Sequence, residues 1–300
     1  MPSRPVSRPV PHRLVAAIIL VLGAVAAASP TARAADSVTL FAELAKPALL
    51  PNRIEWREAR ATGPSSLILS GVTLRLAPNL LWPEGYPIRI ARAVIEDIDF
   101  DGLRRHAAPE RLRLRLDGIA AGGAPFGLPQ LGRLNGGAYL DYRAEPGQGL
   151  RIEHFSLELP GLAHLDLALD LGGSGARAGR LNIDTFDTLT LRSGWISYAD
   201  GSLLAKVVAA EAARRHVKES TVVAEWSLVL GVALMREGGN GLSPLVAILA
   251  YLKDYRAPKG PLRITFAAPP DAPDGLPLAE MLSAGVLRTL GAKVSYAGAP

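Results

Sequence analysis

The sequence predicts an α+β protein: a long antiparallel, curled β-sheet that runs as a meander, with helices packed late, after about residue 200. Three observations predict this class. Between residues 54 and 198, apolar residues recur at every second position, which is typical of strands with one buried face. Glycine- and proline-rich turns separate these segments. After Asp200 the apolar spacing changes to that of a helix.

Five segments show the alternation of a strand. Their alternating apolar positions are Val72, Leu74 and Leu76; Ile88 and Ile90; Leu112, Leu114 and Leu116; Leu165, Leu167, Leu169 and Leu171; and Leu189 and Leu191. Polar, charged or small residues lie between them. Each segment therefore has one face suited to a core and one suited to solvent.

The register of one hairpin, over residues 150–171, can be predicted. The apolar parity changes between Ile152 and Phe155, which predicts a β-bulge near residues 153–154. A three-residue turn at 160–162 then brings the apolar residues of both strands onto one face. The predicted pairs are Leu157 with Leu165, Phe155 with Leu167, Ile152 with Leu169, and Leu150 with Leu171.

The last third of the chain reads as helices with short strands. Helices are predicted at 202–217, 219–235, 244–255 and 277–290, and strands at 262–266 and 293–296. The strongly apolar run 222–235 is too short to span a bilayer and is predicted as a core helix, with a membrane- or partner-facing helix as the alternative. No linker separates two units, so residues 35–300 are predicted to form one β-rich domain, with the sheet mainly in 35–200 and the helices and one or two short strands in 201–300.

The first 34 residues resemble a secretory signal. A basic start with Arg4, Arg8 and Arg13 precedes an uncharged run over 14–28, and Ala32-Arg33-Ala34 offers a cleavage site before residue 35. The chain is therefore expected in the periplasm after cleavage, with retention as an N-terminal anchor in the inner membrane as the alternative. The composition looks bacterial.

Charge and cysteine content exclude several classes of function. The first 34 residues hold four arginines and no acid, so the rest of the chain has 29 basic against 28 acidic residues. This balance argues against a nucleic-acid partner, which needs a basic footprint. The chain has no cysteine, which excludes disulfides and thiolate chemistry.

No motif predicts an enzyme, a cofactor or a metal site. Asp97-Ile98-Asp99-Phe100-Asp101-Gly102 matches the first half of a calcium loop, but position 12 is Ala108 instead of Glu. Ile98 and Phe100 also fit strand alternation, so aspartates on a solvated strand face are favoured over a calcium site. His154 and His164 are expected as a surface pair close together in the hairpin. The serine-elbow, phosphate-loop and dinucleotide patterns are all missing from the sequence.

Arg111, Arg113 and Arg115 form a basic stripe along one predicted strand face. The favoured interpretation is a solvated face whose arginines pair across strands with acids such as Glu96, Asp97 or Asp99. The alternative is contact with anionic lipid headgroups.

Residues 134–171 (LNGGAYLDYRAEPGQGLRIEHFSLELPGLAHLDLALDL) resemble the strand repeats of AsmA-like bacterial envelope proteins. Residues 191–215 (LRSGWISYADGSLLAKVVAAEAARR) are similar to an element of uncharacterised exported proteins of alphaproteobacteria. The resemblance implies a long curled sheet with an apolar inner face and a role in the cell envelope, with lipid or another hydrophobic molecule as ligand. It brings no catalytic residues.

These observations predict a non-enzymatic envelope protein that binds a lipid-like ligand in an apolar groove of the curled sheet. The expected groove residues are Leu112, Leu114, Leu116, Phe155, Leu157, Leu165, Leu167 and Leu169. The alternative is a structural protein without a ligand that docks an envelope partner, and peripheral contact with a membrane is a further possibility. No catalytic residue, cofactor or metal is predicted.

Overall fold

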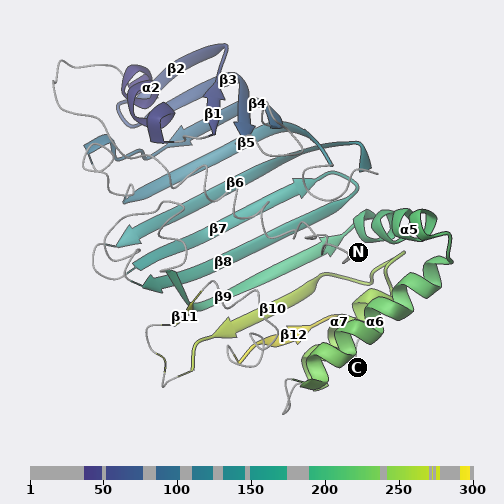
Figure 1. Ribbon diagram of the computed structural model, residues 1–300. Helices are drawn as coiled ribbons and strands as arrows, with labels where there is room; N and C mark the ends of the chain where they lie inside the picture. The colour runs from purple at the N-terminus through teal and green to yellow at the C-terminus, as the bar shows by residue number, and fades with distance from the viewer. Residues whose placement is uncertain are drawn as a thin grey trace, which may run out of the picture.

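The computed structural model describes residues 37–48, 52–76, 86–101, 110–123, 131–145, 149–173, 189–236, 242–269, 272, 275–277 and 291–297. Within these residues the chain forms one open, antiparallel, twelve-stranded sheet and four helices, which confirms the predicted α+β class (Figure 1). The predicted export signal lies outside the described residues.

The strands succeed one another across the sheet almost in chain order. The order is β1-β3-β4-β5-β6-β7-β8-β9-β10-β12, with β2 also on β3 and β11 also on β9. Their bounds are β1 Arg53–Glu55, β2 Glu58–Gly63, β3 Ser66–Leu76, β4 Tyr86–Glu96, β5 Arg111–Gly122, β6 Arg133–Glu145, β7 Gly149–Leu159, β8 Ala163–Gly173, β9 Leu189–Asp200, β10 Leu262–Ala267, β11 Leu276–Pro277 and β12 Lys293–Ser295. From β3 to β10, strands that are consecutive in the chain are neighbours in the sheet, which makes it a meander. Helices α5, α6 and α7 lie in the connection between β9 and β10.

Helix α2 lies near the β1–β3 edge of the sheet and helices α6 and α7 near the β10–β12 edge, whereas α5 lies beyond the ends of β8 and β9 (Figure 1). Their bounds are α2 Ser37–Ala48, α5 Leu203–Arg215, α6 Glu219–Arg236 and α7 Leu242–Lys253. Helix α2 packs on β2 and β3, whereas α7 packs on β10 and β12 and is joined to α5 through α6. The three late helices were predicted, but α2 was not, although its buried Phe41 and Leu44 have helical spacing.

The predicted hairpin register is correct at every pair. β7 and β8 pair Leu157 with Leu165 and Phe155 with Leu167, and the register shifts between Ile152 and Phe155 before the remaining two pairs. The shift confirms the bulge, which restores the apolar parity after one extra residue.

The apolar residues of neighbouring strands share one face, called here the apolar face. One row crosses the sheet from β3 to β12 through Leu67, Ile95, Leu114, Leu140, Phe155, Leu167, Ile196, Ile264 and Val294. The opposite, polar face carries the intervening charged residues. An antiparallel sheet with this pattern buries one face and leaves the other to solvent.

One predicted helix start is wrong. Pro277 was expected to begin a helix over 277–290, but Leu276 and Pro277 form β11, with Leu276 opposite Leu191 of β9. Residues 278–290 lie outside the described residues.

Candidate functional site

The eight predicted groove residues all lie on the apolar face, on β5, β7 and β8. They differ in burial. Leu112, Leu114, Phe155 and Leu167 are buried, at no more than 6% exposure. Leu116, Leu157, Leu165 and Leu169 are partly buried and pack against the same core. The first four therefore act as core residues, and a ligand on this face would contact the second four.

Tyr142 of β6 is a polar residue on the apolar face that the sequence analysis missed. It lies opposite Leu112 and Ile152 and is 3% exposed. Its hydroxyl oxygen is buried and has no hydrogen-bond partner among the described residues. Burial raises the pKa of Tyr142, and the charge of Asp99 raises it further, so the hydroxyl stays neutral and can donate. Tyr142 comes two residues after Leu140 in β6 and therefore lies on the same face, and this spacing in the sequence could have revealed it.

An unpartnered buried hydroxyl costs free energy. At 3% exposure Tyr142 is as buried as the four core residues, so it belongs to the core and not to the surface that a ligand would contact.

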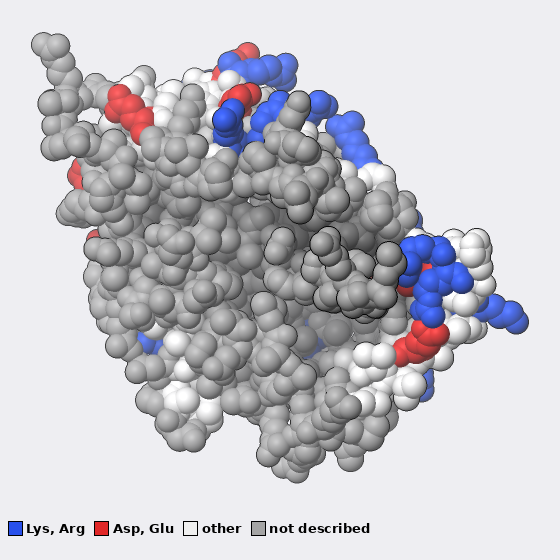
Figure 2. Space-filling model, in the orientation of Figure 1, with Lys and Arg blue, Asp and Glu red and all other residues white. Residues whose placement is uncertain are grey.

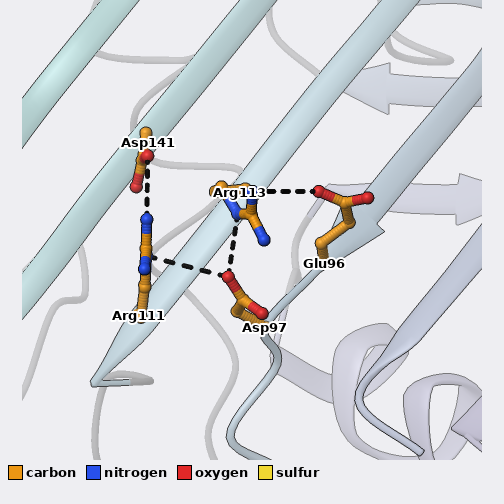
Figure 3. Close-up of polar contacts among 5 residues, drawn as sticks. All are labelled: Glu96, Asp97, Arg111, Arg113 and Asp141. Atoms are coloured by element: carbon orange, nitrogen blue, oxygen red, sulfur yellow. Dashed lines mark hydrogen bonds and ion pairs between the residues drawn. The ribbon is translucent and has the colours of Figure 1, made fainter. Parts of the chain in front are cut away.

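The basic stripe is paired with acids on the polar face (Figure 3). Arg113 Nε donates to Asp97 Oδ2 at 2.8 Å, and its Nη1 lies 3.6 Å from Glu96 Oε2. Arg111 lies 3.7 Å from the same Asp97 oxygen and 3.3 Å from Asp141 Oδ2. The hydrogen bond to Asp97 raises the pKa of Arg113 despite some desolvation.

The third arginine of the stripe, Arg115, pairs with Asp117 at 2.9 Å. The structure therefore confirms the predicted pairing for Arg111, with Asp97, and for Arg113, with Glu96 and Asp97, whereas Arg115 pairs within its own strand. Carboxylates beside these guanidinium groups balance their positive charge, which weakens their attraction for anionic lipid headgroups.

The strand predicted over the calcium-like segment is wrong, because β4 ends at Glu96 and the chain turns at Asp97. Asp97 has a positive φ of 61° at the end of β4 and binds the two arginines. Ile98 and Phe100 are buried. Among the described residues, no group of three or more His, Asp or Glu side chains is arranged to hold a metal ion.

The two hairpin histidines share one carboxylate on the polar face. Asp166 Oδ1 lies 3.1 Å from His154 Nε2, and its Oδ2 lies 2.6 Å from His164 Nε2. His164 Nδ1 also hydrogen-bonds Glu158, its cross-strand partner. Both rings are exposed enough to meet water, so this is the surface pair that the hairpin register predicted.

Helix α6 has one side that is buried and another side that is apolar but exposed. Val222 and Val223 pack into the cluster between α5, α6 and α7. Leu228 and Val229 are 67% and 69% exposed, and Val232 is also exposed. The prediction of a core helix is confirmed for the first side. The second side is exposed, and the membrane- or partner-facing alternative stays a prediction for it. No helix of the described residues has the length and hydropathy needed to cross a membrane.

Comparison with known proteins adds no assignment: no protein-family model matches the chain, and no curated protein matches it. The resemblance to AsmA-like proteins stays a prediction.

Proposed function

We propose that this is an exported, non-enzymatic protein of the cell envelope that binds a lipid-like or other hydrophobic ligand against the apolar face of its sheet. The observation that carries the proposal is the apolar face itself, which continues in register from β3 to β12. The described helices make their main sheet contacts with β2, β3, β10 and β12, near the two edges. Strands β5 to β8 lie between these contacts.

The chemistry of this face suits a long apolar molecule. Leu116, Leu157, Leu165 and Leu169 are partly buried, and each buried methylene of a ligand contributes about 0.8 kcal/mol. Lipid binding would therefore need few specific polar contacts.

The direct test is mass spectrometry of lipids extracted from the protein after purification from the periplasm without detergent. A defined lipid at near-stoichiometric amount is expected. The variant Leu157→Gln with Leu165→Gln should lose this lipid, since it places two amides on the apolar face. The matched control is Val229→Gln, which makes the same polar change on α6.

A charge at a core position such as Leu167 would not distinguish lost ligand binding from lost folding. Leu167 is 4% exposed, so a buried carboxylate in Leu167→Glu would unfold the protein and thereby abolish binding. A wild-type protein that carries no lipid, in a folded state confirmed by circular dichroism, would contradict the proposal.

The second candidate is a structural protein that docks an envelope partner, and the exposed patch on α6 favours it. Leu228, Val229 and Val232 form its apolar surface, and Val246 of the neighbouring α7 is also exposed. Both acids of α6 are held in ion pairs, Glu219 by Arg256 and Glu225 by Arg215. Exposed apolar patches of this kind mark interaction sites.

The same variants separate the two candidates. In the docking function, Val229→Gln should abolish crosslinking to the partner in the envelope. Leu157→Gln with Leu165→Gln should leave this crosslinking intact if it folds. The opposite result would favour the lipid function.

A further inference from the structure

A hollow of about 730 Å³ lies at the end of the sheet where β6 begins, β7 turns into β8 and α5 starts. We call it the α5 hollow. Its polar lining comes from Arg133, Asn135 and Lys206, and its apolar lining includes Leu131, Pro160 and Leu162. A volume of this size is typical of sites for small organic ligands.

Hydrogen bonds hold α5 against the turn and so maintain the hollow. The Leu162 carbonyl accepts the backbone N–H groups of Gly201, Ser202 and Leu203 at 2.8, 3.0 and 3.1 Å. Ser202 Oγ donates to the Gly161 carbonyl at 2.7 Å. Since these bonds and Asp200 satisfy the first N–H groups of α5, the charge of the hollow comes from side chains.

The hollow is cationic. Arg133 and Lys206 are both exposed, and no ion pair with another described residue is recorded for either. No carboxylate is present in the described lining. The acids nearest along the same elements are engaged, Glu158 with His164 and Glu211 with Arg214.

Further basic charge lies at the same end of the polar face. Leu134 is buried between Arg133 and Asn135, so strand alternation directs these two side chains to the polar face. Asn135 pairs with Ala120, which in turn pairs with the exposed Arg89 of β4. Figure 2 shows basic side chains with acidic ones beside them around α5, and further basic side chains along the rim above it. Such a field raises the local concentration of anions.

We propose that the α5 hollow is a binding site for an organic phosphate with an apolar body. The Arg133 guanidinium offers a planar pair of donors to a phosphate, Lys206 adds a second charge, and the Asn135 amide adds a neutral donor. The hollow is much larger than a phosphate ion, and its leucine and proline walls suit the apolar part of the ligand. The site lies on the polar side of β6, so it does not depend on ligand binding at the apolar face.

The test is isothermal titration calorimetry of the purified protein with decyl phosphate, with decyl maltoside as the neutral probe of equal chain length. Decyl phosphate should bind, and Lys206→Ala should weaken its binding about tenfold because one charged hydrogen bond is lost. Arg133→Gln should weaken it by a similar factor. Lys218→Ala is the matched control, since Lys218 is an exposed lysine just beyond α5.

Salt and competition give independent readouts. Raising the ionic strength should weaken decyl phosphate binding and leave decyl maltoside unaffected. Equal binding of both probes, or unchanged affinity in Lys206→Ala and Arg133→Gln, would overturn the proposal. Displacement of decyl phosphate by an equal concentration of inorganic phosphate would overturn its organic part and identify a free phosphate as the ligand. Loss of binding in Leu157→Gln with Leu165→Gln but not in Lys206→Ala would place the probe on the apolar face instead.

Discussion

Two tyrosines on the apolar face, the buried Tyr142 and the partly buried Tyr198, differ in the hydrogen-bond partner of the hydroxyl. Tyr198 donates to Asp200 Oδ1 at 2.7 Å, and Asp200 in turn accepts the N–H of Leu204 at the start of α5. Tyr142 has no partner among the described residues. Burial raises the pKa of both tyrosines, so both hydroxyls are neutral donors at any physiological pH.

This difference predicts that replacing tyrosine by phenylalanine changes the free energy of unfolding differently at the two positions. Tyr142→Phe should leave the free energy of unfolding unchanged or raise it slightly, because no hydrogen bond is lost. Tyr198→Phe should lower it by about 1 kcal/mol, because Asp200 loses a donor. Urea unfolding at an unchanged m-value is the measurement. An equal loss in both variants would show that the Tyr142 hydroxyl has a partner in the apo protein.

The polar face has its own titrating residue, His164. Partial burial alone would lower its pKa, but the hydrogen bonds and charges of Glu158 and Asp166 outweigh this, and the net pKa is raised. The protonated ring is therefore favoured in the folded state. Its contribution to stability is complete below the ordinary histidine pKa of about 6.5 and is lost as the pH rises through the raised folded pKa.

His164→Gln should accordingly destabilise the protein more at about pH 5 than at about pH 9. Urea unfolding of wild type and variant at the two pH values measures this difference. Glu158→Gln is the complementary variant, and it should lower the pKa of His164 in an NMR titration of the imidazole. A pKa of His164 that does not change in Glu158→Gln would mean that this hydrogen bond has no role.

At the scale of elements, the bulge in β7 decides which side chains face the core. Asp141 of β6 pairs with His154 and Tyr142 pairs with Ile152, so Glu153 is the residue without an opposite partner on that strand. Removing a residue from a strand normally moves all later side chains to the other face. Glu153 is an exception, since its removal leaves Ile152, His154 and Phe155 in strict alternation.

Deletion of Glu153 should therefore give a folded protein with a modest loss of stability. Deletion of Ser156 is the matched control, because it brings Phe155 and Leu157 next to each other and turns one of them to the polar face. Phe155 is 1% exposed, so this variant should lose more than about 3 kcal/mol. Circular dichroism measures whether each deletion variant folds, and urea unfolding measures its free energy of unfolding. Equal failure of the two deletions would mean that the twist caused by the bulge is itself required.

At the scale of the whole molecule, the sheet separates two chemistries. The polar face holds the ion pairs of β4, β5 and β6 and the histidine pair of β7 and β8. The other face is apolar from β3 to β12. Because the sheet is an open meander, both faces extend along most of the chain, and the α5 hollow forms where three distant segments meet at one end.

The sequence by itself determined most strands of the meander, the three late helices and the β7–β8 register, bulge included, although it did not assign the central strand β6. These depend on local periodicity and on turns of a few residues, which are visible in a single segment. Only the tertiary structure decided that Leu167 is core while Leu165 is partly accessible, that Tyr142 lacks a partner, and that Arg133 and Lys206 share a hollow. Alternation assigns a side chain to a face, but its burial and its charge partners depend on what packs there from elsewhere in the chain.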